Sequence, residues 1–339
     1  MANVRQFIPG DVPQIVSLLR NQMGLERYTD KYFFWKYGYS VTASARPLGL
    51  VAIAGGAIVG FAAFFPYCMC TGEILWNVDD VIVRKDHRRR GLFTQLMTYG
   101  LGIIDGRGED SYLFASSMAK QGYARLGYTD AFDLDYRVHI PKWETLLGSK
   151  GKLANMTGKV LDRAVKWLYP QPAHLEGITF NRIESFPQAV RLDTPIGNWR
   201  MIRKRPDFLN WRFFAHPWNN YDCYLARDRR RVVGYVVFEK CNMMDFHAIG
   251  MKYFRPLFEF ARSRFVETET KVANTYMHCP EAVNSVIRES GFVKWDWKMR
   301  PFGLYPQKTL MYRESPSSKV DFKNLRQWFF KMADMDCGD

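Results

Sequence analysis

Three arginines and a glycine, Arg88 to Gly91, stand between the β-branched run Val81 to Val83 and an apolar segment from Phe93 to about Ile104. This order predicts a strand, a basic loop and a helix. The first backbone N–H groups of a helix are free to bind an anion, and the helix dipole favours negative charge there. The arginines add bidentate donors, and Gly91 lets the backbone approach a ligand because it has no Cβ. The segment therefore predicts a site for a pyrophosphate or a similar anion.

The loop resembles motif A of the GCN5-related N-acetyltransferases (GNAT), which reads Arg/Gln-x-x-Gly-x-Gly/Ala. Arg88 and Gly91 match this motif, whereas Phe93 departs from its small last residue. Tyr123-Ala-Arg-Leu-Gly-Tyr128 resembles the Tyr-x-x-Leu-Gly-Phe/Tyr ending of motif B, and the segment from Val4 to Leu19 is similar to the family's first strand and helix. Three matches in the family's order identify residues 1–140 as GNAT-like.

The resemblance implies an enzyme that transfers an acetyl group from acetyl-CoA to the primary amine of a small molecule, directly within a ternary complex. In the family, the strand before the loop separates from its neighbour, and its backbone groups bind the pantetheine arm and the thioester carbonyl. The matching residues here are Val81, Ile82 and Val83. Those matching the pyrophosphate site are Arg88, Arg89, Arg90, Gly91, Leu92 and Phe93. Ser116 and Ser117 stand where the family often has an Asn that contacts the pantetheine.

Asp79 and Asp80 precede the same β-branched run, and strand alternation predicts that they point to opposite faces, with Asp79 on the face of Val81. A similar acidic pair occurs in polyamine acetyltransferases of this fold, where the first acid serves the amine. We therefore predict Asp79 as the base or amine-orienting carboxylate and Asp80 as the alternative, with Glu73 as a further candidate. Tyr123 matches the family's frequent general acid, because a phenol stays protonated at neutral pH and can donate to the leaving thiolate.

An internal repeat predicts a second copy of the domain. The matching pairs are Val4–Leu18 with Ile178–Leu192, Trp35–Tyr37 with Trp211–Phe213, Ala57–Phe61 with Arg231–Tyr235, and Gln121–Tyr128 with Ile287–Phe292. Met251 to Pro256 stands where the basic glycine loop would lie in the second copy. We therefore predict that the second copy is degenerate and does not bind coenzyme A.

A chain of 339 residues, 47% of them hydrophobic, is long enough for two cores. The predicted fold is α/β, with two tandem GNAT-like domains that each contain a twisted, mostly antiparallel mixed sheet with helices on both faces. The expected divisions are a catalytic domain at 1–145, a connecting helix and linker at 146–176, a degenerate domain at 177–315 and an amphipathic tail at 316–339.

The connecting helix and the tail both have helical amphipathic patterns. In the first, Leu153, Val160, Leu161, Ala164 and Leu168 alternate with Lys152, Lys159, Arg163 and Lys166. In the second, Phe322, Leu325, Trp328, Phe329 and Met332 precede Asp334 and Asp336. Such helices could lie on an anionic membrane. Packing onto the two domains is the simpler interpretation, and we favour it.

Other classes of protein are less consistent with the sequence. Leu48 to Met69 contains no charged residue, but Gly55-Gly56 at its centre predicts a hairpin rather than a membrane span. The N-terminus has no apolar signal-peptide region, and the six cysteines and six histidines lack metal-ligand spacing, so a cytoplasmic protein without a metal is expected. The net charge of +14 is spread over the chain, and its clusters fit the phosphate loop and a solvated turn better than nucleic acid.

The acceptor is the least determined part of the prediction. The overall layout resembles bacterial GNAT proteins of surface-polysaccharide biosynthesis, which implies an amino sugar, free or nucleotide-linked, as the acceptor. One alternative is a Fem-type transferase that uses aminoacyl-tRNA, although the intact Arg88–Gly91 loop favours coenzyme A. A second is a non-catalytic acyl-CoA-binding protein in which Asp79 and Tyr123 are dispensable. A monomer and a homodimer are both compatible with the sequence.

Overall fold

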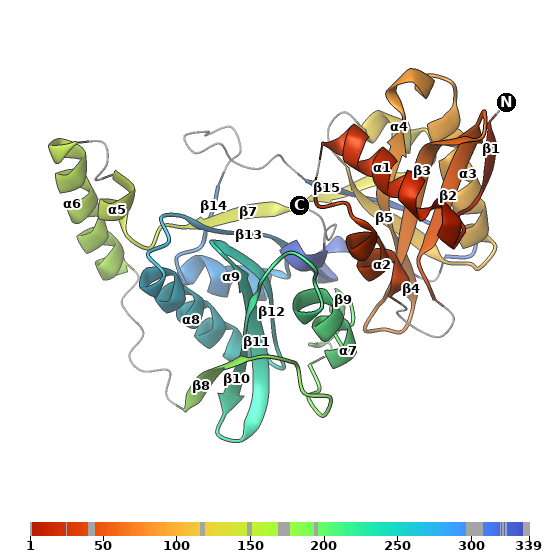
Figure 1. The fold of residues 1–339 in the computed structure, drawn as a ribbon. Helices are drawn as coiled ribbons and strands as arrows, with labels where there is room; N and C mark the ends of the chain where they lie inside the picture. Colours follow the sequence, from red (N-terminus) through yellow and green to blue (C-terminus); the bar gives the residue numbers. More distant parts are fainter. Residues whose placement is uncertain are drawn as a thin grey trace.

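The computed structural model describes residues 2–24, 26–39, 45–115, 119–147, 151–168, 177–192, 196–295, 308–318, 320, 322 and 324–334. These residues form two mixed, mostly antiparallel sheets that lie beside each other with helices packed on them (Figure 1). The chain therefore has the predicted α/β architecture with two sheet-based halves.

The first sheet has the strand order β1-β2-β3-β4-β5-β15-β6. Its strands are β1 (Asn3–Gln6), β2 (Leu48–Ala54), β3 (Ala57–Cys68), β4 (Ile74–Val83), β5 (Asp110–Ala115), β15 (Thr309–Arg313) and β6 (Thr129–Asp133). Gly55 and Gly56 join β2 to β3 and both have positive φ, 57° and 78°, as a tight hairpin turn requires. The uncharged segment is thus a hairpin, and no helix in the described part of the chain is long and apolar enough to cross a membrane.

Helices cover both faces of this sheet. Those on one face are α1 (Val12–Met23) and α2 (Asp30–Gly38), and those on the other are α3 (Leu92–Asp105) and α4 (Lys120–Ala124). Alternation along β2 explains the two layers, because Leu50 packs towards α3 while Val51 packs towards α1. Gly100 brings α3 close to the sheet, since a Cβ there would lie 2.3 Å from the Phe64 ring.

The second sheet has the strand order β14-β7-β13-β12-β11-β10-β8. Its strands are β14 (Val293–Lys294), β7 (Asp135–His139), β13 (Ala273–His278), β12 (Asn242–Ala248), β11 (Arg231–Glu239), β10 (Asp222–Asp228) and β8 (Ile178–Ile183). On one face lie α8 (Phe254–Glu267) and α9 (Glu281–Glu289). The other face packs on α7 (Pro206–Leu209) and the π-helical turn Asn210–Phe214. The counterpart of α1, residues 184–192, contains no helix.

Each sheet contains one strand from the other half of the chain. β15 lies between β5 and β6 in the first sheet, and β7 lies between β13 and β14 in the second. In the repeat, β7 and β15 are the last strands of their copies, so the two copies exchange equivalent strands. The predicted boundaries at 145 and 177 follow the repeat in the sequence, but hydrogen-bonded pairing crosses them in both directions.

The repeated Trp motif joins the two copies directly. Trp35 and Trp211 stack with ring centroids 5.1 Å apart. Each indole N–H donates to the backbone carbonyl of the other tryptophan, at 3.0 and 2.8 Å. The apolar core around them is continuous, because Tyr67 of β3 and Tyr235 of β11 belong to one cluster. The halves are therefore joined by packing as well as by strand exchange.

Two predictions about the linker and the tail differ from the structure. The connecting segment forms α5 (Trp143–Leu147) and α6 (Lys152–Leu168), which pack on each other and leave an apolar row of α6 exposed. The expected packing of this helix onto the two domains was therefore wrong. The tail packs into the core, but as a strand, β16 (Trp328–Lys331), that pairs with β13 and with β9 (Arg200–Met201). The predicted helical pattern failed because all four residues of β16 are buried.

Candidate functional site

The parallel strands β4 and β5 separate within the first sheet. The residues paired between them are Leu75–Asp110, Trp76–Ser111 and Asn77–Tyr112. β4 continues to Val83 and β5 to Ala115, but among the described residues their pairing stops at Asn77. β4 remains paired with β3 on its other edge. Val81, Ile82 and Val83 therefore lie where the two strands have parted, in the arrangement that the family resemblance implied.

A β-bulge places the two acids. Ala62 pairs with Val81 and Phe64 with Val78, so Asp79 and Asp80 together face one residue of β3. An extra residue in a strand disturbs the alternation of side chains. The Lys36 ammonium lies 3.1 Å from Asp79 Oδ2 and 3.2 Å from Asp80 Oδ2. The prediction that the two carboxylates point to opposite faces was therefore wrong, because alternation holds only in a regular strand.

The buried partners of Asp80 indicate a structural role for this residue. Besides Lys36, it accepts hydrogen bonds from the hydroxyls of Tyr28, at 2.7 Å, and Tyr37, at 2.6 Å. Burial and the nearby charges of Asp79 and Asp80 raise the pKa of Tyr37 well above its ordinary value, so Tyr37 stays a donor. Sequence reasoning did not identify Lys36, Tyr28 and Tyr37 as part of this site. The repeated Trp35-Lys36-Tyr37 motif was the signal that pointed to two of them.

Comparison with the second copy distinguishes Asp79 from Asp80. Its β11–β12 pair has the same bulge, since Val236 pairs with Phe246 and Phe238 with Met243. This register aligns Asp80 with Asp245 and Asp79 with Met244. Asp245 is also fully buried and binds the ammonium groups of two lysines, Lys204 and Lys331, each at 2.9 Å. The copy without the basic loop thus keeps the buried acid and lacks the one at position 79.

Tyr123 lies on the face of the first sheet that is covered by α3. It is buried, and its ring packs on those of Phe93 at 5.4 Å and Tyr128 at 5.7 Å. Burial, followed by the negative charge of Asp79, raises the pKa of Tyr123 to about 12. The phenol therefore keeps its proton at neutral pH. The charge of Asp79 on β4 thus adds to the effect of burial on Tyr123 of α4.

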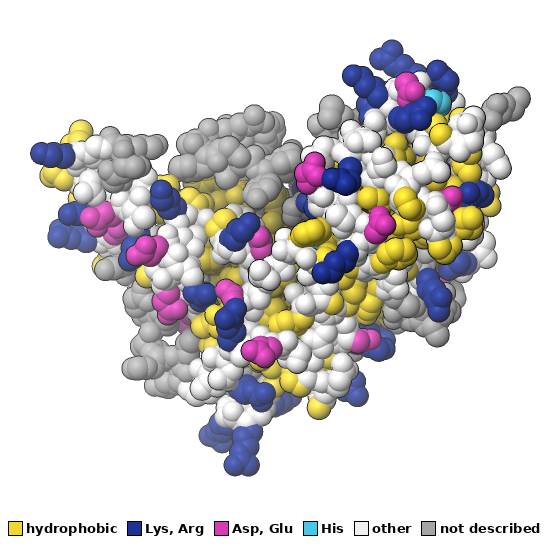
Figure 2. All heavy atoms as spheres, in the orientation of Figure 1, with side chains coloured by type: hydrophobic (Ala, Val, Ile, Leu, Met, Phe, Trp, Pro, Cys, Tyr) yellow, Lys and Arg dark blue, Asp and Glu magenta, His cyan; other side chains and the backbone are white. Residues whose placement is uncertain are grey.

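The basic loop leads into α3 as expected. Arg89 and Gly91 have φ of 62° and 77°, in the left-handed region that Gly91 adopts without strain. Arg88 Nε donates to Val83 O at 3.0 Å, so this side chain holds the loop against the end of β4. Arg89 and Arg90 are exposed, and Figure 2 shows Lys and Arg side chains gathered over this end of the first copy. The first amides of α3 and two guanidinium groups thus lie next to the separated strands.

Other predicted residues lie elsewhere. Ser116 and Ser117 fall outside the described residues. Glu73 lies just before β4, six residues from Asp79 along an extended segment, and pairs with Arg200 at 3.9 Å. In the described part of the chain, no group of three or more His, Cys, Asp or Glu residues is placed to hold a metal ion.

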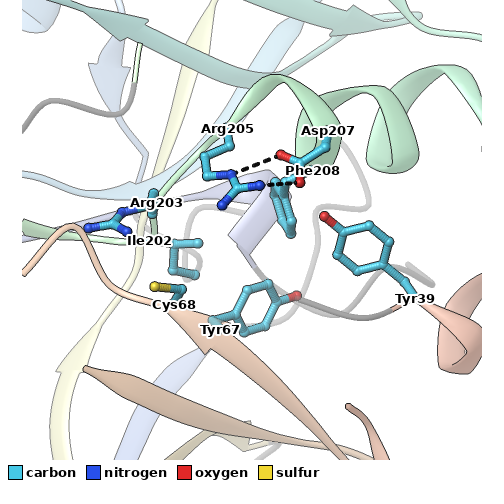
Figure 3. A pocket seen from close by; sticks show the side chains of 8 residues that line it. All are labelled: Tyr39, Tyr67, Cys68, Ile202, Arg203, Arg205, Asp207 and Phe208. Atoms are coloured by element: carbon cyan, nitrogen blue, oxygen red, sulfur yellow. Dashed lines mark hydrogen bonds and ion pairs between the residues drawn. The ribbon is translucent and has the colours of Figure 1, made fainter. Parts of the chain in front are cut away.

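A small hollow of about 40 Å³ lies where the two copies meet (Figure 3). Its lining residues are Tyr39, Tyr67, Cys68, Ile202, Arg203, Arg205, Asp207 and Phe208. Tyr39 and Tyr67 from the first copy both pack edge-on to Phe208 from the second, with ring centroids 6.1 and 6.0 Å apart. Arg205 forms two hydrogen bonds with Asp207, at 3.1 and 2.7 Å.

Two residues of the hollow are linked to the acids and to the paired part of β4 and β5, although neither acid lines the hollow. Tyr39 follows Tyr37, whose hydroxyl binds Asp80, by two positions in the chain. Tyr67 packs at 6.3 Å on Tyr112, the last residue of β5 that pairs with β4. The sequence did not predict this hollow, because its walls come from segments more than a hundred residues apart.

Comparison with known proteins agrees with this architecture. Residues 3–131 match the family model described as an acetyltransferase (GNAT) domain. A GCN5-related N-acetyltransferase from Anabaena variabilis has a similar fold, with a TM-score of 0.63 and 11% identity over 98% of this chain and 82% of that one. A probable N-acyltransferase from Enterococcus faecalis gives 0.64 and 11% over 94% and 73%. A tandem GNAT protein from the clavulanic acid biosynthesis pathway gives 0.55 and 12% over 95% and 100%.

No sequence among the curated proteins matches significantly. At identities this low, the similar structures establish the fold of the whole chain, and the family model identifies the first copy. Residues 3–131 therefore match the GNAT acetyltransferase domain, and the whole chain has a fold similar to that of a tandem GNAT protein.

Proposed function

We propose that this protein transfers an acetyl group from acetyl-CoA to a primary amine of a small molecule, by direct transfer in a ternary complex. The observation that carries the proposal is the parting of β4 and β5 after Asn77, next to Asp79 and before the basic loop that leads into α3. Backbone groups of Val81 to Val83 would hold the pantetheine arm, and Arg89, Arg90 and the first amides of α3 would bind the pyrophosphate. Arg88 would support the loop.

The donor, when bound, supplies the acetyl group as a thioester and leaves as a thiol. The chain supplies two proton sites for this exchange. Asp79 accepts the proton that the amine loses, or orients the amine. The Tyr123 hydroxyl donates the proton that the departing sulfur gains. If all three groups are ionised, Asp79, Asp80 and Lys36 together leave a net negative charge. This charge favours the approach of a cationic amine.

The hollow between the copies supports an acceptor with a ring and an anionic group. Tyr39 is only partly buried at the hollow, and an aromatic side chain offers a flat apolar surface on which sugar and nucleobase rings stack. Arg203 at the same hollow offers positive charge for a phosphate or a carboxylate, whereas Arg205 is paired with Asp207. An amino sugar linked to a nucleotide combines these features with a primary amine, and we propose this class of acceptor.

Two measurements test the proposal. Calorimetry with acetyl-CoA should give one site per chain, and thiol release with a panel of amines should be fastest for nucleotide-linked amino sugars. Free amino sugars are the matched controls, because they keep the amine and lack the anionic group. Binding of acetyl-CoA without thiol release for any amine would favour a non-catalytic protein. Binding of aminoacyl-tRNA without acetyl-CoA would favour an aminoacyl transferase.

A further inference from the structure

Helix α6 presents a row of apolar side chains to solvent. Leu153, Met156, Val160 and Trp167 are 79%, 65%, 63% and 81% exposed. Their spacing of three, four and seven residues places them on one side of the helix. Exposed apolar residues that are scattered singly need no explanation, but a continuous row along one helix indicates a contact surface.

The other side of α6 already has a partner. Gly158 lies so close to α5 that a Cβ there would come within 2.6 Å of Glu144 Cα. Asp162 accepts hydrogen bonds from the backbone N–H groups of Trp143, at 2.6 Å, and Glu144, at 3.1 Å. The two helices thus form a hairpin with its own internal contacts. Figure 1 shows this hairpin at the edge of the molecule, beyond the second sheet.

Basic side chains border the apolar row. Lys152, Lys159 and Arg163 are exposed and follow one another at helical spacing along one edge of it. The acidic groups nearby are engaged, since Glu144 pairs with Lys159 at 3.5 Å and Asp162 binds the start of α5. An apolar row with a cationic border suits the boundary of an anionic bilayer, where apolar groups enter the acyl region and cations meet the headgroups.

We propose that the α5–α6 hairpin docks this protein on a membrane surface that contains anionic lipids. A second copy of the chain fits less well, because two α6 rows brought together would need an acidic border to meet the basic one. The described residues of the hairpin offer only Glu144 and Asp162, which are already engaged. The net charge of +14 adds a general attraction to the same surface. Docking is separate from acetyl transfer and does not depend on it.

Co-sedimentation with vesicles tests the proposal. The full chain should bind vesicles of equal parts phosphatidylcholine and phosphatidylglycerol, and bind phosphatidylcholine alone much more weakly. The triple variant Leu153→Gln, Val160→Gln, Trp167→Gln should lose binding, because it removes the apolar row and keeps the charges. The matched control, Ile8→Gln with Tyr99→Gln, removes exposed apolar side chains from the first copy and should bind like the unchanged protein.

A second variant tests the basic border without changing the apolar row. Lys152→Gln with Arg163→Gln should weaken partitioning about fivefold for each charge removed, and added salt should then have less effect. Full binding by the apolar triple variant, or equal binding to both kinds of vesicle, would overturn the proposal. A dimer in size-exclusion chromatography that the triple variant converts to a monomer would also overturn it, because the row would then join two copies.

Discussion

Asp79 and Asp80 are neighbours in the sequence with different surroundings. Asp80 is tied to Lys36, Tyr28 and Tyr37, and Asp245 has an equivalent buried position in the second copy. Asp79 shares Lys36, and its charge also contributes to the raised pKa of Tyr123. The bulge brings both carboxylates to Lys36, and the hydrogen bonds from Tyr28 and Tyr37 tie Asp80 to α2 and the residues before it.

The two acids should therefore respond differently to the same substitution. Asp79→Asn should lower turnover roughly a hundredfold, since it removes the carboxylate that serves the amine. Asp80→Asn should mainly lower the free energy of unfolding, by about 3 kcal/mol, because it removes the charge of a buried ion pair and one of the two oxygens that accept hydrogen bonds. Turnover and urea unfolding of both variants measure this. A larger loss of stability for Asp79→Asn than for Asp80→Asn would reverse the assignment.

Tyr123 offers a similar test against a neighbouring tyrosine. Tyr123→Phe should keep the affinity for acetyl-CoA and reduce turnover by roughly a hundredfold, because only the proton donor is lost. With a thioester of a more acidic thiol, the reduction should be smaller. Tyr128→Phe is the control, since that hydroxyl binds Ser111 at 2.7 Å and is not assigned to the reaction. Equal turnover for Tyr123→Phe and the unchanged enzyme would make Tyr123 a core residue.

At the scale of elements, the three arginines of the loop between β4 and α3 are all exposed, and one of them also supports the loop. Arg88 donates a hydrogen bond to the carbonyl of Val83 at the end of β4. The helix that follows supplies amides from its first turn. We therefore expect the loop to bind the charged pyrophosphate of acetyl-CoA and not its acyl group.

Arg90→Ala should weaken binding of acetyl-CoA by about tenfold or more, since a charge-assisted hydrogen bond to phosphate is lost. Binding of acetyl-pantetheine, which lacks the pyrophosphate, should not change. Arg230→Ala, in the exposed turn between β10 and β11, is the control for lost surface charge. Calorimetry with the two ligands measures both effects. Equal weakening for both ligands would place Arg90 outside the phosphate site.

Across the whole molecule, strand exchange makes the two halves depend on each other. A fragment of residues 1–145 lacks β15, and with it Leu310 and Met311, two buried side chains. It also leaves β5 and β6 without the strand that joins them. We expect this fragment to show no cooperative urea unfolding, and to become soluble when it is co-expressed with residues 146–339. A fragment that unfolds cooperatively by itself would contradict this dependence.

His139 on the exchanged strand β7 should make the stability depend on pH. Burial lowers the pKa of His139 from 6.5 to about 4, against the effect of the Gly291 carbonyl that it contacts at 3.0 Å. Between these values the unfolded chain binds more protons than the folded chain. Stability should therefore be full above about pH 6.5 and fall as the pH drops towards 4, by up to about 3 kcal/mol from this group.

Urea unfolding from pH 7 to 4 measures this dependence. His139→Gln removes the titrating group, so its stability should fall less steeply over that range than that of the unchanged protein. Other acids and histidines titrate in both proteins, which makes the difference between the two curves the relevant quantity. Parallel curves would mean that His139 does not carry the effect.

The amino-acid sequence by itself determined the local elements and the order of the repeat. Gly55-Gly56 required a turn, Val81 to Leu92 required a strand, a loop and a helix start, and the paired Trp motifs marked two copies. These features depend on side-chain type and on spacing over a few residues, which a sequence displays directly. Tyr123 was predicted in the same way, because its motif is local.

Only the tertiary structure decided which distant segments meet. Alternation could not reveal the bulge that brings Asp79 and Asp80 to one lysine, because an extra residue leaves no separate mark in the sequence. Trp328 to Lys331 had a helical apolar pattern, yet burial on all sides made it a strand. The exchange of β7 and β15 was also hidden, since a strand shows the same pattern whichever sheet it joins, and the choice of partner comes from packing between residues far apart in the chain.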